Sequence, residues 1–322
     1  MTTRFKAIAC VASLCTLLAA GAQAETIRIA YETSDTHLKA RTVQVFADKL
    51  AELSNGAVTV ETFPNASLIP SRQEVNAAIR GQTEAIVPFI SYYEAVAPSV
   101  KVFTMPMLFA GYDHLAEAWN GPIGAKVSEE LEAVGLKPLG FWFETPTHLF
   151  TTGDEVTNLG ELEGLKIRTY PSALLEATLT NLGAVATVIP GSEVYLALQN
   201  NTVDGAITTP SFAASIKLTD VLKTMTVVDL AFGGYVFAIN KQFFDGLSDE
   251  NQQAILDAAA TATEWNSEEI ATEVQATLDM MGEAGITVLS LDEGDRDNWV
   301  KAVQPVYDGQ DADLKAMIEA AQ

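Results

Sequence analysis

Short apolar strands alternate with helical segments along the chain, and this alternation constrains the fold more than any other feature. The apolar strands Thr26–Tyr31 and Val58–Phe63 enclose His37–Leu53, whose apolar residues recur at helical spacing. The same order of strand and helix continues towards the C-terminus. Strands that alternate with amphipathic helices are typical of proteins in which helices cover the faces of a sheet. The sequence therefore predicts an α/β fold.

The later elements follow from similar signals. The sequence Ser71-Arg72-Gln73-Glu74 has the form of a capping box, which predicts a helix from Ser71 to Gly81. Apolar runs bounded by turn residues predict further strands at Ala85–Ile90, Val100–Thr104, Pro138–Phe143, Leu149–Thr152, Leu165–Thr169, Ala184–Ile189, Gly205–Thr208, Thr226–Asp229 and Tyr235–Asn240.

The longest helical segment begins at Ser248, where a polar cap and two acidic residues suit a helix N-terminus. Neither Gly nor Pro occurs from Asn251 to Met281. At a rise of 1.5 Å per residue, one helix of about 50 Å is expected, long enough to run along two small domains. Two shorter helices broken near Trp265–Ser267 are the alternative.

Length and an internal similarity both favour two lobes. The 322 residues exceed the size at which a single hydrophobic core stops growing. Glu74–Ile79 precedes a strand containing Ala85-Ile86, and Glu193–Leu198 precedes a strand containing Ala206-Ile207. Each unit has an acidic helix start, an apolar helix face, a turn and a buried strand. The sequence thus predicts two similar α/β lobes, each a β-sheet flanked by helices.

The first residues, Met1–Ala24, have the features of a secretory signal peptide. Two basic residues, Arg4 and Lys6, precede an apolar stretch, and Ala22-Gln23-Ala24 has the small-x-small form of a signal peptidase site. A buried first helix is the alternative. We therefore expect an exported, periplasmic protein whose signal peptide is removed after Ala24.

The composition excludes several classes of site. The formal net charge is −23, and it becomes −25 without the signal segment, which contains two basic and no acidic residues. A nucleic-acid binder needs a basic footprint, so nucleic acid is not expected as a partner. Both cysteines, Cys10 and Cys15, lie in the signal segment, so neither a disulfide nor a thiolate metal site is expected. The three histidines have no metal-ligand spacing, and neither a metal nor a cofactor is predicted.

The sequence lacks the common catalytic motifs. The sequence contains no G-x-S-x-G elbow, and it contains neither of the glycine-rich nucleotide-binding motifs. An enzyme is therefore not favoured, although carboxylates from distant positions could still pair between two lobes. An exported, acidic and two-lobed chain without cysteine has the profile of a solute-binding protein that closes on its ligand.

A succession of motifs identifies the family that the chain resembles. Leu162–Arg168 (LEGLKIR) is followed by Asn181–Ala184 (NLGA), Ser192–Gln199 (SEVYLALQ) and Val203–Gly205 (VDG). Together with the long late helix, this succession closely resembles the solute-binding subunits of TRAP (tripartite ATP-independent periplasmic) transporters of the DctP type. The resemblance covers the chain beyond the signal segment.

The resemblance implies a two-lobed periplasmic binding protein fold, with crossing strands between the lobes and one long helix spanning both. We predict a signal peptide at 1–24, lobe I at 25–147 plus 234–275, and lobe II at 148–233 plus 276–322. A small organic anion, usually a carboxylate, would bind between the lobes and pass to integral-membrane permease subunits without ATP. The solute-binding protein of an ATP-driven importer and an exported enzyme acting on a carboxylate are the alternatives.

Arg168 matches the signature arginine of the resembled family. It ends a predicted strand just before Pro171, where ligand crevices form in α/β sheets. A guanidinium group can bind a carboxylate through two parallel hydrogen bonds. The alternative is a structural arginine paired with Glu163 or Glu176.

Three further polar residues are candidate ligand contacts. Thr208 stands where relatives often carry an Asn that bonds the carboxylate, and His148 stands where many carry a second arginine. Histidine is only partly charged at neutral pH, so a dicarboxylate becomes a less favoured ligand. Glu32 ends the first strand, where it would repel a second carboxylate and accept hydrogen bonds from hydroxyl or cationic nitrogen groups. The alternatives are that Thr208 and His148 bond only the backbone and that Glu32 is exposed.

Aromatic residues complete the candidate site. Phe89, Tyr92 and Tyr93 follow the third strand, and one of them is expected to cover the apolar face of the ligand, although most aromatic residues belong to the core. Trp142 and Phe212 are further candidates, with packing at the lobe junction as the alternative for Trp142. The expected ligand is a monocarboxylate with hydroxyl or cationic nitrogen groups, such as a sugar acid, a hydroxy acid or an ectoine-like zwitterion.

Overall fold

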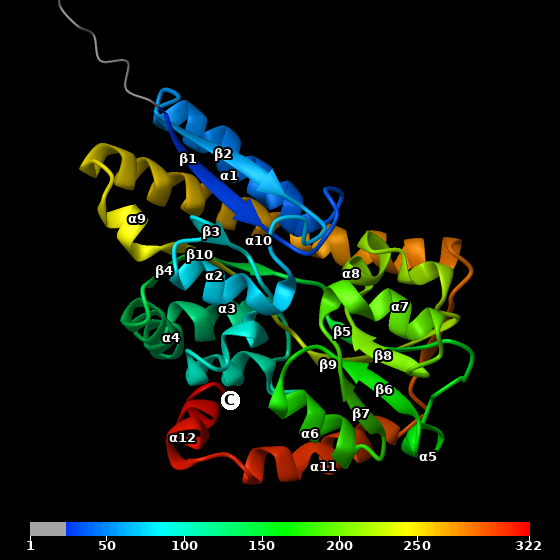
Figure 1. Cartoon of the computed structure of the whole chain (residues 1–322). Coiled ribbons are helices and arrows are strands. Elements are labelled where there is room, and N and C mark those ends of the chain that lie inside the picture. Colours follow the sequence, from blue (N-terminus) through cyan, green and yellow to red (C-terminus); the bar gives the residue numbers. More distant parts are fainter. Residues whose placement is uncertain (1–23) are drawn as a thin grey trace, which may run out of the picture.

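The computed structural model describes residues 24–322, so all of the predicted signal peptide except Ala24 lies outside the described residues. The fold is α/β and contains two mixed sheets with helices around them (Figure 1). The first sheet has the strand order β2-β1-β3-β10-β4. Its strands are β1 (Glu25–Ala30), β2 (Val58–Phe63), β3 (Ala85–Ile86), β4 (Leu136–Phe143) and β10 (Gly234–Asn240).

The second sheet has the order β11-β9-β5-β8-β6-β7. Its strands are β5 (Thr147–Thr151), β6 (Lys166–Thr169), β7 (Val185–Val188), β8 (Gly205–Thr208), β9 (Thr224–Ala231) and β11 (Thr287–Ser290). The two sheets share one topology. In the first sheet, β2, β1 and β3 are parallel to one another; β10 then pairs antiparallel with β3, and β4 pairs antiparallel with β10. In the second sheet, β7, β6 and β8 are parallel in the same way; β5 pairs antiparallel with β8, and β9 pairs antiparallel with β5. The internal similarity seen in the sequence therefore reflects two lobes of the same design.

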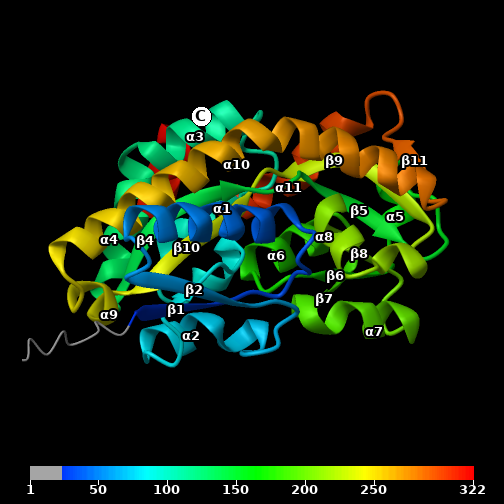
Figure 2. The same cartoon turned by 90° about the horizontal axis from the view of Figure 1, so that it is seen from above.

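The chain crosses between the sheets at the connections from β4 to β5 and from β9 to β10. A third crossing is α10 (Asp249–Glu283), which Figure 2 shows running alongside α1 (Leu38–Leu53) from the end near α9 to the end near β11. The helix is continuous over 35 residues, and its N-cap Ser248 accepts a hydrogen bond from the backbone N–H of Asn251. The alternative of two shorter helices is therefore wrong.

The remaining helices surround the sheets. They are α2 (Glu74–Ile79), α3 (Tyr112–Asn120), α4 (Pro122–Ala133), α5 (Leu159–Leu162), α6 (Ala173–Asn181), α7 (Val194–Gln199), α8 (Pro210–Ser215), α9 (Lys241–Asp245), α11 (Asp295–Asp308) and α12 (Ala312–Ala320). Short 3-10 helices lie at η1 (Ser71–Gln73), η2 (Ile90–Tyr93), η3 (Pro98–Thr104), η4 (Gly191–Glu193) and η5 (Leu218–Asp220). Within residues 24–322, no helix combines the length and the apolar character needed to cross a membrane.

The long helix is fixed to the first crossing by specific contacts. Its buried face is rich in alanine, including Ala258, Ala259 and Ala262, which lets α1 and β4 pack closely against it. The buried Asn266 accepts a hydrogen bond from the backbone N–H of Phe143 at 2.6 Å and donates one to the carbonyl oxygen of Phe143 at 3.4 Å. Because both bonds satisfy backbone groups at the end of β4, they hold the crossing strand in register with the helix.

Two local predictions are wrong. Val100–Thr104 is part of the 3-10 helix η3, which begins at Pro98, and is not a strand. A short apolar run has no periodicity that distinguishes a strand from a helical turn. Ser71 does not cap a helix: Pro70 precedes the 3-10 turn η1, and the Ser71 hydroxyl has no hydrogen-bond partner among the described residues. The helix α2 begins at Glu74 instead.

The end of the chain makes contacts on the sides of both sheets. The predicted division assigns 276–322 to lobe II, and α11 does pack against α6 on that side. However, α12 packs against η3 beside the first sheet, and His114 in α3 hydrogen-bonds the carbonyl oxygen of Ala321. The C-terminal helix therefore lies on the lobe I side of the molecule (Figure 1), because its apolar face is buried there. The predicted lobe limits stay a prediction.

Candidate ligand-binding site

A small, partly open cavity lies between the two sheets. Its walls come from the segments that follow β1 and β3 in the first sheet and β6 and β8 in the second, with one residue of β10. The lining residues are Glu32, Phe89, Tyr92, Arg168, Tyr170, Thr208, Thr209, Phe212 and Tyr235. Because β1 and β3 hold the same places in their sheet as β6 and β8, the carboxyl ends of equivalent strands face each other, where ligand crevices form in α/β sheets.

Six of the eight predicted site residues line this cavity: Arg168, Thr208, Glu32, Phe89, Tyr92 and Phe212. The structure does not place His148 or Trp142 in its lining. Tyr93, the third aromatic residue after β3, is buried in the core, where its hydroxyl donates to the carbonyl oxygen of Val236 at 3.1 Å.

Arg168 is the cation of the cavity and is only 2% exposed. Its Nε donates to the carbonyl oxygen of Ile189 at 2.8 Å, which fixes the side chain along the end of β6. No protein acceptor is recorded for its two Nη atoms among the described residues, so they remain available to a ligand. Burial lowers the pKa of Arg168, an effect opposed by Tyr92 and Glu32, yet a guanidinium group stays charged at any physiological pH. The structural pairing with Glu163 or Glu176 does not occur.

Glu32 faces the same cavity and is buried, not exposed. The Tyr92 hydroxyl donates to its Oε2 at 3.4 Å and accepts the backbone N–H of Gly191 at 3.3 Å. Tyr92 therefore links a carboxylate after β1 to the backbone after β7 in the other sheet. The cavity thus contains one fixed cation and one carboxylate, and both lobes contribute to their surroundings.

Aromatic rings form the apolar walls. The ring of Phe89 packs edge to face against Tyr170 at 4.9 Å between centroids and against Tyr235 at 5.6 Å. Phe212 adds a further ring from α8. Such rings suit the apolar faces of a small organic molecule, while polar groups at a few points fix its orientation.

The threonines after β8 present hydroxyl groups. Thr209 is the N-cap of α8, and its Oγ1 accepts the backbone N–H of Phe212 at 3.3 Å, which leaves its hydroxyl hydrogen free to donate. For the Thr208 hydroxyl, no protein partner is recorded among the described residues, so the alternative in which it bonds its own backbone is not observed. Both hydroxyls can donate to an oxygen of a ligand.

His148 lies in β5, directly opposite Thr208 of β8, and it is buried outside the cavity lining. Its Nδ1 accepts the backbone N–H of Asp229 at 3.3 Å. Burial lowers the pKa of His148 to about 4, even though Asp229 acts in the opposite direction. Burial thus disfavours the charged form of His148, and its hydrogen bond to Asp229 matches the alternative in which it bonds the backbone.

Trp142 packs against the long helix instead of the cavity. Its Nε1 donates to the Thr263 hydroxyl at 3.1 Å, and its ring lies 4.8 Å from that of Phe237. Trp142 lies near the end of β4, and its side chain contacts α10, as the lobe-junction alternative expected.

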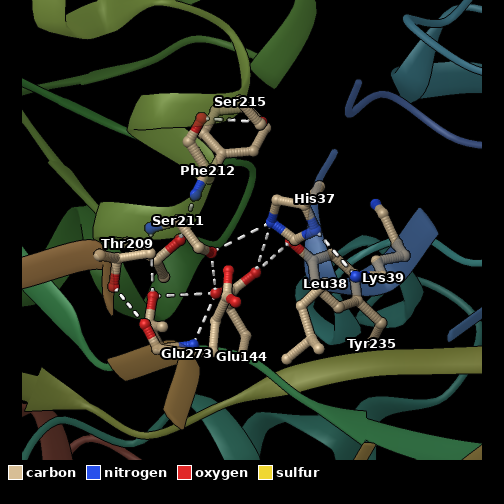
Figure 3. Close-up of polar contacts among 12 residues, drawn as sticks. His37, Leu38, Lys39, Glu144, Thr209, Ser211, Phe212, Ser215, Tyr235 and Glu273 are labelled. Atoms are coloured by element: carbon tan, nitrogen blue, oxygen red, sulfur yellow. Dashed lines mark hydrogen bonds and ion pairs between the residues drawn. The ribbon is translucent and has the colours of Figure 1, made fainter. Parts of the chain in front are cut away.

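A buried carboxylate next to the cavity gathers polar groups from both lobes (Figure 3). Glu144 lies in the crossing between β4 and β5 and has no exposed surface. Its Oε2 accepts the Tyr235 hydroxyl at 2.7 Å and lies 3.0 Å from His37 Nε2, while the Ser211 hydroxyl donates to Oε1. Burial opposes ionisation of Glu144, but the contacts with His37, Ser211 and Tyr235 outweigh it and lower the pKa of the carboxyl to about 2.

Ser211, His37 and Glu144 bring together the residue types of a hydrolase triad, but their hydrogen bonds differ from those of a triad. His37 Nδ1 accepts the backbone N–H of Lys39 at 3.0 Å, so the ring proton lies on Nε2. The Ser211 hydroxyl donates its hydrogen to Glu144, not to the imidazole. A triad needs an unprotonated nitrogen facing the serine, and this arrangement does not supply one.

Three residues that line the cavity were missed by sequence reasoning. Tyr170 and Thr209 directly follow strand ends that carry Arg168 and Thr208, and this adjacency is a signal that could have identified them. Tyr235 lies inside the apolar strand β10, where nothing in the sequence separates it from a core residue. Within residues 24–322, no group of three His, Cys, Asp or Glu side chains is placed to hold a metal ion.

The sequence also matches a known family. Residues 29–313 match the profile described as bacterial extracellular solute-binding protein, family 7. A C4-dicarboxylate-binding periplasmic protein, DctP, of Rhodobacter capsulatus is 30% identical over 92% of this chain and 89% of its own length. A 2,3-diketo-L-gulonate-binding periplasmic protein of Escherichia coli is 28% identical over 87% of this chain and 85% of its own.

Solved structures agree with these relatives. A sugar acid binding protein of Advenella mimigardefordensis in complex with galactonate superposes with a TM-score of 0.89 at 26% identity, covering 93% of this chain and 97% of that one. A TRAP periplasmic solute binding protein of Sulfurospirillum deleyianum with bound succinate gives a TM-score of 0.87 at 27% identity, covering 93% and 100%.

Proposed function

The chain belongs to family 7 of the bacterial extracellular solute-binding proteins, the DctP type that serves TRAP transporters, and from this premise we propose that it binds a monocarboxylate that carries hydroxyl groups. A sugar acid is the preferred ligand. The single observation that supports this choice is that Arg168 and Glu32 share one small cavity. The relatives named above are transport proteins that bind organic acids, which agrees with this proposal.

The charges of the cavity favour one carboxylate over two. The free Nη atoms of Arg168 suit a carboxylate bound through two parallel hydrogen bonds. A second carboxylate would meet Glu32, and Arg168 is the one basic side chain in the described lining of the cavity; His148 lies outside it, and burial lowers the pKa of His148 to about 4. Like charges close together in a water-excluded site are strongly unfavourable.

Hydroxyl groups fit the remaining polar atoms. Glu32 accepts hydrogen bonds, and the hydroxyls of Thr208 and Thr209 both donate and accept them, so a polyhydroxy chain finds partners along both walls. The rings of Phe89 and Tyr170 suit its C–H faces. A zwitterion of the ectoine type would also satisfy Glu32 through a cationic nitrogen, and it is the second candidate for that reason.

The remaining parts of the proposal follow from the family. We infer that the signal peptide at 1–24 is removed after Ala24, that the protein then works in the periplasm, and that integral-membrane TRAP permease subunits receive the ligand. The predicted lobes, 25–147 plus 234–275 and 148–233 plus 276–322, would close on the ligand by moving about the crossings.

A thermal-shift screen tests the ligand class. Galactonate, galacturonate, ectoine and succinate are each added to the protein that begins at Glu25. A ligand at a thousand times its Kd adds about 4 kcal/mol of stability, which raises Tm by several degrees. We expect galactonate or galacturonate to give the largest shift, and a larger shift with succinate would contradict the monocarboxylate assignment.

Variants of the cation test the site. Arg168→Lys keeps the charge but loses the planar fork, so it should abolish most of the shift. Lys166→Ala is the matched control, because Lys166 begins the same strand β6 and is exposed. Equal shifts in wild type and Arg168→Lys would show that the ligand binds elsewhere.

A further inference from the structure

The carboxylate of Glu144 joins side chains from the two walls of the cavity. We propose that Glu144, His37, Tyr235 and Ser211 form an interlobe latch, in which Ser211 docks on Glu144 when the cavity closes and so sets ligand affinity without touching the ligand. The inference rests on the proposed function, because it concerns the same cavity. Glu144 and Ser211 are positioning residues in this scheme.

The latch divides cleanly between the lobes. His37 is the N-cap of α1 and Tyr235 lies in β10, so both belong to the side of the first sheet. Ser211 lies in α8, directly after β8 of the second sheet, and Glu144 lies in the crossing between the sheets. Only the contacts of Ser211 therefore join the second lobe to the carboxylate.

The carboxylate is completely hydrogen-bonded in the closed form. Oε2 accepts Tyr235 at 2.7 Å and meets His37 Nε2 at 3.0 Å. Oε1 accepts the Ser211 hydroxyl and the backbone N–H of Thr145, the latter at 2.5 Å. Ser211 also lies 3.1 Å from His37 Nε2, and its own N–H donates to the Thr145 hydroxyl at 3.3 Å. Removal of α8 would break several of these contacts at once.

The latch is mechanically coupled to the cavity. Ser211 stands between Thr209 and Phe212, which both line the cavity, and Tyr235 lines it from the opposite lobe. Figure 3 shows Ser211 of α8 next to Glu144 and His37, while the Phe212 ring points away from them. A ligand that holds the Thr209–Phe212 segment in place therefore also places Ser211 on Glu144.

The physical consequence is a change in the balance between open and closed forms. A hydrogen bond to a charged, buried acceptor is stronger than one between neutral groups. An interaction that is made only in the closed form increases the closed population, and apparent affinity rises in proportion to the competent fraction. The latch thus strengthens binding of any ligand that permits closure.

The test compares Ser211→Ala with Ser128→Ala. The Ser128 hydroxyl donates to the carbonyl oxygen of Gly124 within α4. Ser128→Ala therefore also removes one hydroxyl hydrogen bond, but this bond does not join the two lobes. The measurements are the Kd for galactonate by calorimetry and the Tm without ligand.

Closure is measured directly with spin labels. The chain beyond residue 24 contains no cysteine, so the pair Asn76→Cys and Gln199→Cys on exposed positions of α2 and α7 can be labelled cleanly. We expect Ser211→Ala to weaken galactonate binding about 10- to 100-fold, the factor for one charge-assisted hydrogen bond. At the same galactonate concentration, the distances between the two labels should be longer in Ser211→Ala than in wild type, as in the open form. The Tm of the ligand-free variant should be close to that of wild type.

Other outcomes separate the two proposals. An unchanged Kd and unchanged label separations in Ser211→Ala would overturn the latch, as would an equal loss in Ser128→Ala. If wild type binds neither galactonate nor the other acids of the screen, the proposed ligand class fails. The ligand-free label separations then decide the latch, which requires a smaller short-distance population in Ser211→Ala than in wild type.

Discussion

Gly191 approaches Glu32 so closely that a Cβ on the glycine would lie 2.5 Å from Oε2 of the carboxylate. The two residues belong to opposite lobes, since Glu32 follows β1 and Gly191 starts η4 after β7. The same Cβ would lie 2.8 Å from Cζ of Phe212. The absence of a side chain at residue 191 therefore lets the lobes close over the cavity.

Gly191→Ala should weaken ligand binding by impeding closure. Glu32 is buried and held by Tyr92, so its carboxylate has little room to move away from an added methyl group. We expect at least a tenfold higher Kd for galactonate, which corresponds to about 1.4 kcal/mol. Gly153→Ala is the control, because a Cβ there has no atom within 4 Å. Equal affinity of the two variants would contradict the steric argument.

Glu32→Gln should change the choice of ligand. The substitution keeps the shape of the side chain and removes the negative charge that faces Arg168, so a second carboxylate is no longer repelled. The ratio of the Kd values for succinate and galactonate should fall about tenfold or more, measured by calorimetry at one ionic strength. Glu61→Gln, on an exposed position of β2, controls for the change in net charge. A ratio that does not respond would remove Glu32 from the proposed site.

His148→Gln should flatten the acid side of the stability curve. The pKa of His148 in the folded protein is about 4, below the value of 6.5 for a free histidine, because burial opposes its charge. The unfolded chain therefore binds a proton at higher pH than the folded protein, and stability falls as the pH decreases from 6.5 to 4. The wild type should lose stability from this group over that window, and His148→Gln should lose less.

Urea unfolding between pH 7.5 and 4 measures this difference. The wild type and His148→Gln should show their largest difference in slope between pH 6.5 and 4. Parallel curves for the two proteins would contradict the lowered pKa. Galactonate binding at pH 7.5 should persist in the variant, because His148 does not line the cavity.

Trp142→Phe should affect stability and not binding. The variant loses the hydrogen bond to Thr263 and part of the contact with Phe237, which together should lower the free energy of unfolding by about 1–3 kcal/mol. Denaturant unfolding without ligand measures the loss. Thr263→Val removes the acceptor of the same hydrogen bond and should reproduce part of this loss of stability. If fully folded Trp142→Phe binds galactonate with a higher Kd than wild type does, Trp142 contributes to the binding site and this prediction is wrong.

The strands and the long helix could be predicted because their signals are local. Gly205–Thr208 and Val58–Phe63 are strands with the predicted limits, and the uninterrupted run after Ser248 forms one helix. The errors arose where local signals are ambiguous. The apolar run at Val100–Thr104 fits either a strand or a helical turn, and the polar pattern at Ser71 was overridden by Pro70.

The candidate site could be predicted in part. Residues at the ends of parallel strands, such as Arg168 and Glu32, have a position that the strand pattern reveals, and both line the cavity. The role of a side chain inside a strand depends on what packs against the sheet at that point. Trp142 and Tyr235 are cross-strand partners on one face of the sheet, yet Trp142 contacts α10 and Tyr235 lines the cavity.

By itself the sequence determined the α/β architecture, the two related lobes and the arginine at a strand end, because each depends on short-range periodicity and on residue chemistry. Only the tertiary structure decided the rest. In the folded protein His148 is buried, which disfavours its charged form. Ser211 contacts Glu144, although 67 residues of chain separate them. Burial and long-range contact are properties of the assembled lobes, so no local pattern specifies them.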